Sequence, residues 1–298
     1  METPETAPEA ADTTAAATET VENETPVYLQ GPVGVQELLN AGVHFGHLTS
    51  RWNPKMKPFI FMQRNGVHVL DLMQTETLLQ EAADAAARFA RQGKRILYVG
   101  TKKQARESVR RHAESADMPY IVERWFGGTL TNFQTIKGSI RRMETLQRGE
   151  TEGTFAALKK KERLMRTRER EKLENVLSGI AHLGKLPGAL FIVDINREHI
   201  AVDEARKLGI PIIALVDTNT DPTLVDFPIP ANDDALRSID LICGVISQAI
   251  IGASKGARRD DADDAGIAEK IGSTERVGDD DDTSTSGRAA EAVSDDEA

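Results

Sequence analysis

Short apolar runs alternate with amphipathic stretches along most of the chain. Five runs rich in Ile, Leu, Val and aromatic residues have the length and composition of buried strands. They lie at residues 95–99, 120–122, 189–193, 211–216 and 227–229, and helix-spaced stretches lie at about 102–116, 197–208 and 234–254. Continuous apolar strands that alternate with helices are typical of a parallel sheet covered on both faces. The pattern predicts a doubly wound, flavodoxin-like α/β domain with right-handed crossovers.

The segment before this alternation predicts a loop and a β-hairpin. Glycines and prolines interrupt residues 42–58, so we expect a loop there. Two β-rich runs at 59–63 and 67–70 are joined through Asn65-Gly66, the signature of a tight hairpin turn. Asp71 is placed to cap the helix that follows the second run.

A long helical segment interrupts the alternation at residues 131–183. Its first half has apolar residues every three or four positions, and a polar, glycine-bounded turn follows at 149–153. Its second half places Leu164 and Met165 on the apolar side of another helix. Two helices with apolar seams and a short connection predict an antiparallel helical hairpin, a coiled-coil arm that protrudes from the α/β domain.

The net charge of −10 is concentrated at the two ends of the chain. Residues 1–25 carry seven acids and no base, and residues 260–298 carry fourteen acids and three bases. Both segments have few large apolar residues and are predicted to be disordered, because they bury too little surface to offset the entropy of ordering. Residues 26–259 hold 34 bases and 26 acids, so a basic body is expected between acidic tails. The tails suggest either adaptation to high salt or shielding of the basic body.

These observations predict four parts. They are an acidic tail at 1–25, an α/β body made of 26–130 and 184–259, an arm at 131–183, and an acidic tail at 260–298.

Several classes of protein are excluded by composition. No run of about 18 apolar residues suggests a membrane span, and the N-terminus lacks the basic and apolar regions of a secretory signal. The single cysteine, Cys243, rules out a disulfide framework and fits a reducing cytoplasm.

Enzyme motifs are weak. Gly100 and Lys102 follow a predicted strand, but the spacing of a phosphate-binding loop is absent. The literal GxSxG match at 252–256 lies at the end of an apolar helix and not in a strand-to-helix turn. No nucleophile with a base and an orienting group is apparent, so catalysis is not predicted.

A metal site is a candidate at the carboxyl ends of the predicted strands. Asp217 ends one strand, Asp233 precedes the last helix, and His47 lies in the loop at 42–58. Because strand ends converge in this fold, the three side chains could bind a divalent ion such as zinc or magnesium. The alternative is that the carboxylates cap loops and helices while the histidine bonds to them.

Basic residues make a stronger case, for contact with nucleic acid. Lysines and arginines in loops pair with phosphates, and a neighbouring Trp or Asn can stack on or bond to bases. The candidate contacts are Arg51, Trp52, Asn53, Lys55, Lys57, Arg64, Lys102, Lys103, Arg106, Arg124, Asn132, Lys137 and Arg141. On the arm, acids are interleaved with the bases, so a solvated helix face with intrahelical ion pairs remains the alternative.

Six separated motifs, in order, resemble one family. They are GVHFGH at 42–47, RWNPKMKPFIF at 51–61, RWFGGTLTN at 124–132, LMRTRE at 164–169, GIP at 209–211 and VDTNTDP at 216–222. Together they closely resemble the bacterial small-subunit ribosomal protein two family, from about Val33 to Gly252. The acidic extensions at both ends depart from the family pattern.

The resemblance implies a structural constituent of the small ribosomal subunit without catalytic activity and without a required cofactor. It implies cytoplasmic binding to small-subunit rRNA and to neighbouring ribosomal proteins, and docking of ribosomal protein one. Some family members resemble metal-binding proteins at the positions of His47, Asp217 and Asp233. The alternatives are a nucleotide- or metal-binding flavodoxin-like protein, and an adaptor that binds only proteins. No membrane and no small-molecule substrate are expected.

Overall fold

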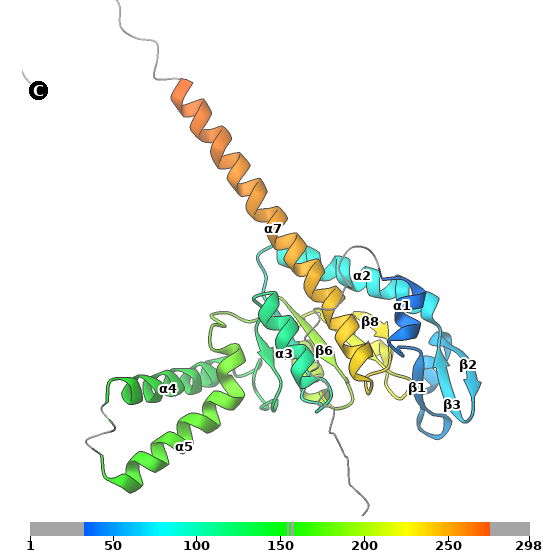
Figure 1. Ribbon diagram of the computed structural model, residues 1–298, viewed down its shortest axis with the longest axis horizontal. Helices are drawn as coiled ribbons and strands as arrows, with labels where there is room; N and C mark the ends of the chain where they lie inside the picture. The colour runs from blue at the N-terminus through cyan, green and yellow to red at the C-terminus, as the bar shows by residue number, and fades with distance from the viewer. Residues whose placement is uncertain (1–32, 154, 156–157, 275–298) are drawn as a thin grey trace, which may run out of the picture.

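A five-stranded parallel sheet forms the centre of the computed structural model (Figure 1). The structure describes residues 33–153, 155 and 158–274, with the backbone alone from residue 256. The strands are β4 (Ile96–Val99), β5 (Tyr120–Ile121), β6 (Ala189–Val193), β7 (Ile212–Val216) and β8 (Phe227–Pro230). Their spatial order, β5-β4-β6-β7-β8, is the 2-1-3-4-5 order of flavodoxin-like sheets. The predicted parallel α/β sheet is confirmed.

Helices cover both faces of this sheet. In β4, Ile96 and Tyr98 face one core and Leu97 and Val99 face the other, and all four side chains are fully buried. The first core is closed by α2 (Leu72–Arg91), α3 (Arg106–Ser115) and α7 (Leu236–Thr274), and the second by α6 (His199–Leu208) and the start of α4. Burial on both faces explains why these strands are uninterrupted apolar runs.

The first half of α7 is apolar and long enough to cross a membrane. By length and composition, residues 236–255 meet that test, and half of this segment is buried inside the protein. Ile239, Ile242 and Ile246 have no exposed surface, and α7 packs against both α2 and α3. The segment is the core helix of the α/β sandwich.

A small antiparallel sheet stands beside the large one (Figure 1). It consists of β1 (Phe45–Leu48), β2 (Ile60–Arg64) and β3 (Val67–Leu70), in the order β1-β3-β2. Asn65 and Gly66 have φ angles of 51° and 76°, the left-handed conformation that the predicted hairpin turn requires. The predicted loop at 42–58 is more ordered than expected, because it contains β1 and two 3₁₀ helices, η1 (Thr49–Arg51) and η2 (Pro54–Phe59). Helix α1 (Val35–Asn40) precedes it.

Two long helices, α4 (Phe133–Thr151) and α5 (Lys160–Leu177), lie alongside each other and project from the body (Figure 1). The apolar side of α4 is buried from Phe133 to Leu146. The expectation for Leu164 and Met165 is wrong, because their side chains are 50% and 63% exposed. Only Leu177 is buried on α5, next to η4 (Ser178–Ile180) at the base of the pair. The far half of α5 is therefore held by polar contacts.

The C-terminal boundary also differs from the prediction. Helix α7 continues to Thr274, so residues 260–274 of the segment expected to be disordered are helical. Residues 256–274 contain four alanines but also four aspartates and three glycines, so composition alone does not favour helix there. The helix continues from the packed first half of α7, and extending an existing helix costs less than starting a new one. Both the tail at 1–25 and residues 275–298 lie outside the described residues.

Candidate nucleic-acid interface

The basic loop at 51–57 is fixed to the end of the large sheet. The Asn53 backbone N–H donates to the carbonyl of Thr218, after β7, at 2.8 Å, and the Asn53 side chain accepts from the Lys55 N–H at 3.0 Å. Met56 is fully buried beneath the loop. These contacts hold the neighbouring cations, Arg51 and Lys57, in exposed positions on a rigid backbone.

Two residues of this loop already have partners. The Lys55 ammonium lies 2.6 Å from Asp221, the N-cap residue of η5 (Pro222–Leu224). The Trp52 ring packs against the His68 ring at a tilt of 47°, with ring centroids 5.1 Å apart, and is half-buried. Arg51 and Lys57 have no ion pair among the described residues, so they are the loop's free cations.

A second loop, 124–132, is organised around one buried carboxylate. Glu204 on α6 is 5% exposed and accepts from the Trp125 indole N–H at 3.1 Å. It also accepts from the backbone N–H groups of Gly128, Leu130 and Thr131 at 2.7, 2.9 and 3.0 Å. Burial alone would raise the pKa of Glu204, but these hydrogen bonds outweigh burial and lower it. Trp125 is consequently a core residue, while Arg124 beside it is exposed.

The cations that follow β4 divide into exposed and paired residues. Lys103 is exposed. Lys102 turns inward, with 12% of its side chain exposed, and its ammonium lies 2.7 Å from Asp233 and 2.6 Å from Asp234. Arg106 is paired with Glu123 at 2.7 Å. Lys102 thus neutralises the carboxylates at the strand ends, and Lys103 faces solvent.

The remaining candidates lie elsewhere on the molecule. Arg64 is exposed at the tip of the β2–β3 hairpin. Asn132 occupies the position before α4 and accepts from the Thr135 hydroxyl at 2.8 Å. The Lys137 ammonium lies 5.0 Å from the centroid of the Phe133 ring, and Arg141 is exposed one turn further along α4.

The three candidate metal ligands do meet. Ligand atoms of His47, Asp217 and Asp233 all lie within 4.8 Å of one another. His47 Nδ1 is 3.1 Å from Asp217, and one oxygen of the buried Asp233, Oδ2, has no hydrogen-bond partner among the described residues. An imidazole and two carboxylates fit zinc better than magnesium, which prefers oxygen ligands.

Charges at this site are strongly coupled. Burial, with Asp217 and Asp194 nearby, raises the pKa of Asp233 to about 7. Burial would lower the pKa of Lys102, but the surrounding carboxylates outweigh it and raise the pKa. The hydrogen bond to Asp217 raises the pKa of His47. Lys102 already supplies positive charge here, so a metal ion would share the carboxylates with an ammonium.

Comparison with known proteins decides the family. The family model for ribosomal protein S2 matches residues 38–253. The chain belongs to the ribosomal protein S2 family. It is 61% identical over 218 residues to small ribosomal subunit protein uS2 of Salinibacter ruber, covering 73% of this chain and 68% of the relative. It is 58% identical over 219 residues to the protein of the same name from Chlorobaculum tepidum, covering 74% and 88%.

Membership in the S2 family confirms the main expectation. The chain is a small-subunit ribosomal protein, a structural component and not an enzyme, and it works in the cytoplasm as part of the ribosome. Its partners are therefore the rRNA and the neighbouring proteins of that subunit. The nucleotide-binding alternative also meets a physical objection, since Asp194, Asp217 and Asp233 gather at the strand ends where a phosphate would lie.

Sequence reasoning missed the residues that support the S2 loops. Asp221 and Asp234 pair with the candidates Lys55 and Lys102, and Glu204 holds the loop that carries the candidates Arg124 and Asn132. Glu204 did carry a signal. It is an acid on the face of α6 that also presents Ala201 and Ala205 to the core, and a charge at a buried position needs a partner.

Proposed function

We propose that this S2-family protein binds small-subunit rRNA through four exposed cations at the carboxyl edge of its large sheet. These carboxyl-edge cations are Arg51, Lys57, Lys103 and Arg124. Lys103 follows β4, Arg124 follows β5, and the loop of Arg51 and Lys57 is bonded to Thr218 after β7. Parallel strands place their carboxyl ends on one edge, so the four belong to one side of the molecule.

The observation that carries this proposal is the contrast in pairing. The carboxyl-edge cations have no acidic partner among the described residues, whereas Lys55, Lys102 and Arg106 on the same edge are ion-paired. An exposed cation on a fixed loop neutralises a phosphate at little entropic cost. Phosphate contacts of this kind position the protein, and specificity comes from the shape of the folded RNA.

The test is incorporation of the double variant Arg51→Ala/Lys57→Ala into small subunits. We expect less co-sedimentation with the subunit, and a salt dependence of RNA binding that is weaker by about one unit of log–log slope per lost contact. Arg88→Ala/Lys207→Ala removes the same charge from exposed helix positions elsewhere and should behave as wild type. An equal loss of co-sedimentation in both variants would show that only the net charge matters, and would contradict the assignment of RNA binding to the carboxyl edge.

The arm contributes to this proposal in a smaller way. Arg142 pairs with Glu169 at 2.6 Å, and Arg170 pairs with Glu150 at 2.6 Å, so part of its basic charge ties the two helices together. Arg141 is exposed with no acid among the described residues as its partner. We expect the arm, predicted at 131–183, to brace against rRNA or a neighbouring protein through such residues.

We also propose that the outer face of the small sheet docks ribosomal protein one. Strand register places Phe45, Val69 and Met62 in one row, because Val69 pairs with both of the others. Phe45 and Met62 are 53% and 47% exposed, and Leu48 beside them is 51% exposed. An apolar row open to solvent on a sheet face marks a protein contact.

Docking is tested by retention of ribosomal protein one on subunits that carry Phe45→Ser/Met62→Ser. We expect the variant to enter small subunits but to hold less of that protein. Leu208→Ser on α6, where the side chain is 42% exposed, is the matched control for an added polar group. Normal retention in the double variant would contradict the docking surface.

A divalent metal at His47, Asp217 and Asp233 would join strand β1, which carries His47, to the carboxyl edge of the large sheet. Support comes from the close donor set and the unpaired oxygen of Asp233. We expect zinc to raise the melting temperature of the chain and His47→Ala to abolish that rise. His199→Ala, at an exposed histidine, is the control, and an equal rise in both variants would place the ion elsewhere.

A further inference from the structure

A second concentration of positive charge lies at the opposite edge of the large sheet. A cavity of about 460 Å³ opens there, between the C-terminal ends of α2 and α3 and the middle of α7. We call it the amino-edge cavity, because Lys94 and Arg95 in its wall directly precede β4. Its charged lining residues are Arg91, Lys94, Arg95, Asp117 and Lys255.

The charges of this cavity are unbalanced. All four cations are exposed, and the one carboxylate, Asp117, is 2.9 Å from Arg95. Arg91, Lys94 and Lys255 have no ion pair within the described part of the chain. The Lys94 ammonium lies 5.6 Å from the centroid of the Phe89 ring, a contact that leaves its charge uncompensated. Three cations around one concave surface favour an anionic occupant.

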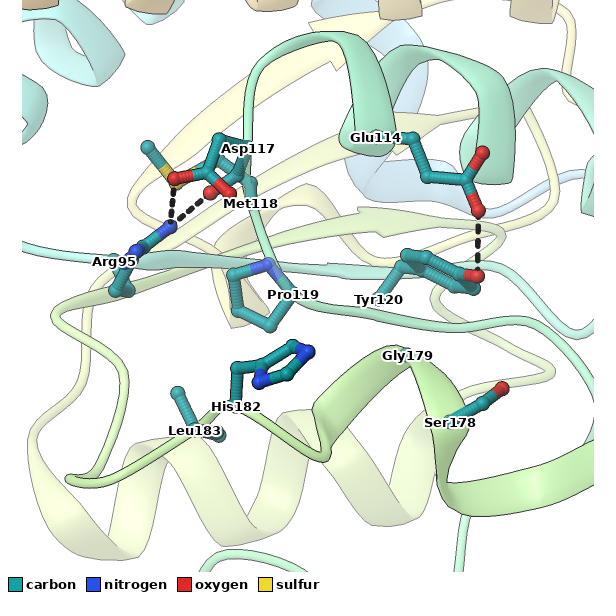
Figure 2. Close-up of a pocket in the computed structure, with 10 residues that line it drawn as sticks. All are labelled: Arg95, Glu114, Asp117, Met118, Pro119, Tyr120, Ser178, Gly179, His182 and Leu183. Atoms are coloured by element: carbon teal, nitrogen blue, oxygen red, sulfur yellow. Dashed lines mark hydrogen bonds and ion pairs between the residues drawn. The ribbon is translucent and has the colours of Figure 1, made fainter. Parts of the chain in front are cut away.

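The neighbouring cavity does not share this character. It shares Arg95, Asp117 and Met118 with the amino-edge cavity and has a volume of about 390 Å³. Its wall contains the carboxylates of Glu114 and Asp117, and the Tyr120 hydroxyl donates to Glu114 at 2.7 Å (Figure 2). Glu114 and Asp117 there face one arginine, Arg95, whereas the amino-edge cavity adds Arg91, Lys94 and Lys255, so an anion is favoured in the amino-edge cavity.

We propose that the occupant is the acidic C-terminal end of this same chain, residues 295–297. Their sequence is Asp-Asp-Glu. Three negative charges in sequence match the three free cations of the cavity, Arg91, Lys94 and Lys255, in sign and in number. The segment is tethered by α7, which itself lines the cavity at Lys255.

The reach of the tether supports this assignment. From Lys255 to the end of α7 at Thr274 the helix rises about 28 Å, at ~1.5 Å per residue. If the 21 residues from Thr274 to Asp295 have the disorder that their composition predicts, their root-mean-square end-to-end distance is about 25 Å. This distance is close to the length of helix between Thr274 and Lys255 in the cavity wall. A linker whose span matches the separation gives an effective concentration in the millimolar range.

The other acidic segments fit less well. Asp279 to Asp282 follow Thr274 by only 5 to 8 residues, which reach at most about 17–27 Å when fully extended. The N-terminal tail joins the body at Val33, in a groove lined by Glu76, Glu81 and Asp84 that repels acids. Residues 295–297 therefore have the required reach and do not have to pass the acidic groove at Val33.

Occupied in this way, the cavity would not take up other polyanions, whether or not the carboxyl-edge cations bind rRNA. The test is zero-length carbodiimide coupling of the full chain, which joins a carboxylate to a lysine only when the two are in direct contact. At low salt we expect amide bonds from residues 295–297 to both Lys94 and Lys255 within one chain. About 1 M salt should reduce their yield at least several-fold, because the Debye length falls to ~3 Å.

Two matched variants separate a specific contact from bulk charge. Asp295→Asn/Asp296→Asn/Glu297→Gln removes the three side-chain carboxylates and should reduce coupling of this segment to Lys94 and Lys255 at least several-fold. The control replaces all four aspartates at 279–282 by Asn, removes more charge, and should leave the coupling unchanged. Coupling of residues 295–297 to Lys103 or to Lys159–161 instead, coupling of Lys94 by N-terminal acids, or no coupling at all would overturn the proposal. Protection of Lys94 and Lys255 by an rRNA fragment, equal with and without residues 275–298, would assign the cavity to RNA and also overturn it.

Discussion

Replacing Glu204 by Ala removes the acceptor that holds the 124–132 loop on α6. The carboxylate is 5% exposed and accepts four N–H groups and the Thr131 hydroxyl. Two of the donors, the Trp125 indole and the Leu130 N–H, are themselves buried and would lose their partner. A buried donor left unpaired costs about 1–3 kcal/mol, so we expect a loss of about 3–5 kcal/mol in the free energy of unfolding.

The milder substitution Glu204→Gln keeps the shape but places an amide NH₂ opposite at least two N–H donors. We expect it to cost about 1–3 kcal/mol. For a domain of this size 1 kcal/mol lowers the melting temperature by about 2–4 °C, so Glu204→Ala should melt ~10 °C below wild type. Thermal unfolding followed by circular dichroism measures both variants. Asp203→Ala, an exposed acid one residue earlier on α6, is the control.

The pH dependence provides an independent check. The hydrogen bonds lower the pKa of Glu204 below its ordinary value of 4.5. Its stabilising effect is therefore complete above pH ~4.5 and is lost as the pH falls through the lowered pKa. The difference between wild type and Glu204→Gln should shrink in acid. A Glu204→Ala melting temperature within the range of the Asp203→Ala control would refute the reasoning that this carboxylate organises the loop.

Three further substitutions test other parts of the fold. Lys102→Ala removes the ammonium that pairs with buried Asp233, which lies beside Asp217. Because the pKa of Asp233 is raised to about 7, ionisation of this carboxyl opposes folding increasingly as the pH rises from ~4 to 7. Urea unfolding should thus show a larger loss at pH 8, about 3–5 kcal/mol, than at pH 5, and an equal loss at both would contradict the coupling. Gly66→Ala forces a φ of 76° on an L-residue and should cost about 1 kcal/mol in the same assay. Gly138→Ala, inside α4 with open space around it, should instead stabilise by about 0.5–1 kcal/mol, and a loss there would mean that α4 needs the glycine.

Periodicity predicted the large elements well because burial on two faces imposes a distinct pattern. The run at 189–193 coincides with β6, and Asn65-Gly66 forms the expected turn. Periodicity failed on α5, where Leu164 and Met165 have the spacing of a seam but stay exposed. Spacing shows which residues share a helix face, and only the neighbouring helix decides whether that face is covered.

Part of the candidate site could be predicted from the sequence. The strand-end rule brought His47, Asp217 and Asp233 together as expected, whereas contact of the basic loops with RNA stays a prediction. The division of the cations into free and paired ones was not predictable. Lys102 and Lys103 are adjacent in sequence, yet one lies among three carboxylates and the other faces solvent.

The sequence alone determined the parallel α/β sheet, the family, and the separation of a basic body from acidic ends. Each of these follows from local composition or from the order of residues along one strand or loop. The tertiary structure decided which charges are compensated, because ion pairs such as Lys55–Asp221 join residues 166 positions apart. It also decided that Trp125 belongs to the core and that cations gather around a cavity at the amino edge. Such facts depend on distances across the fold, and the order of residues along a chain does not fix them until the chain has packed.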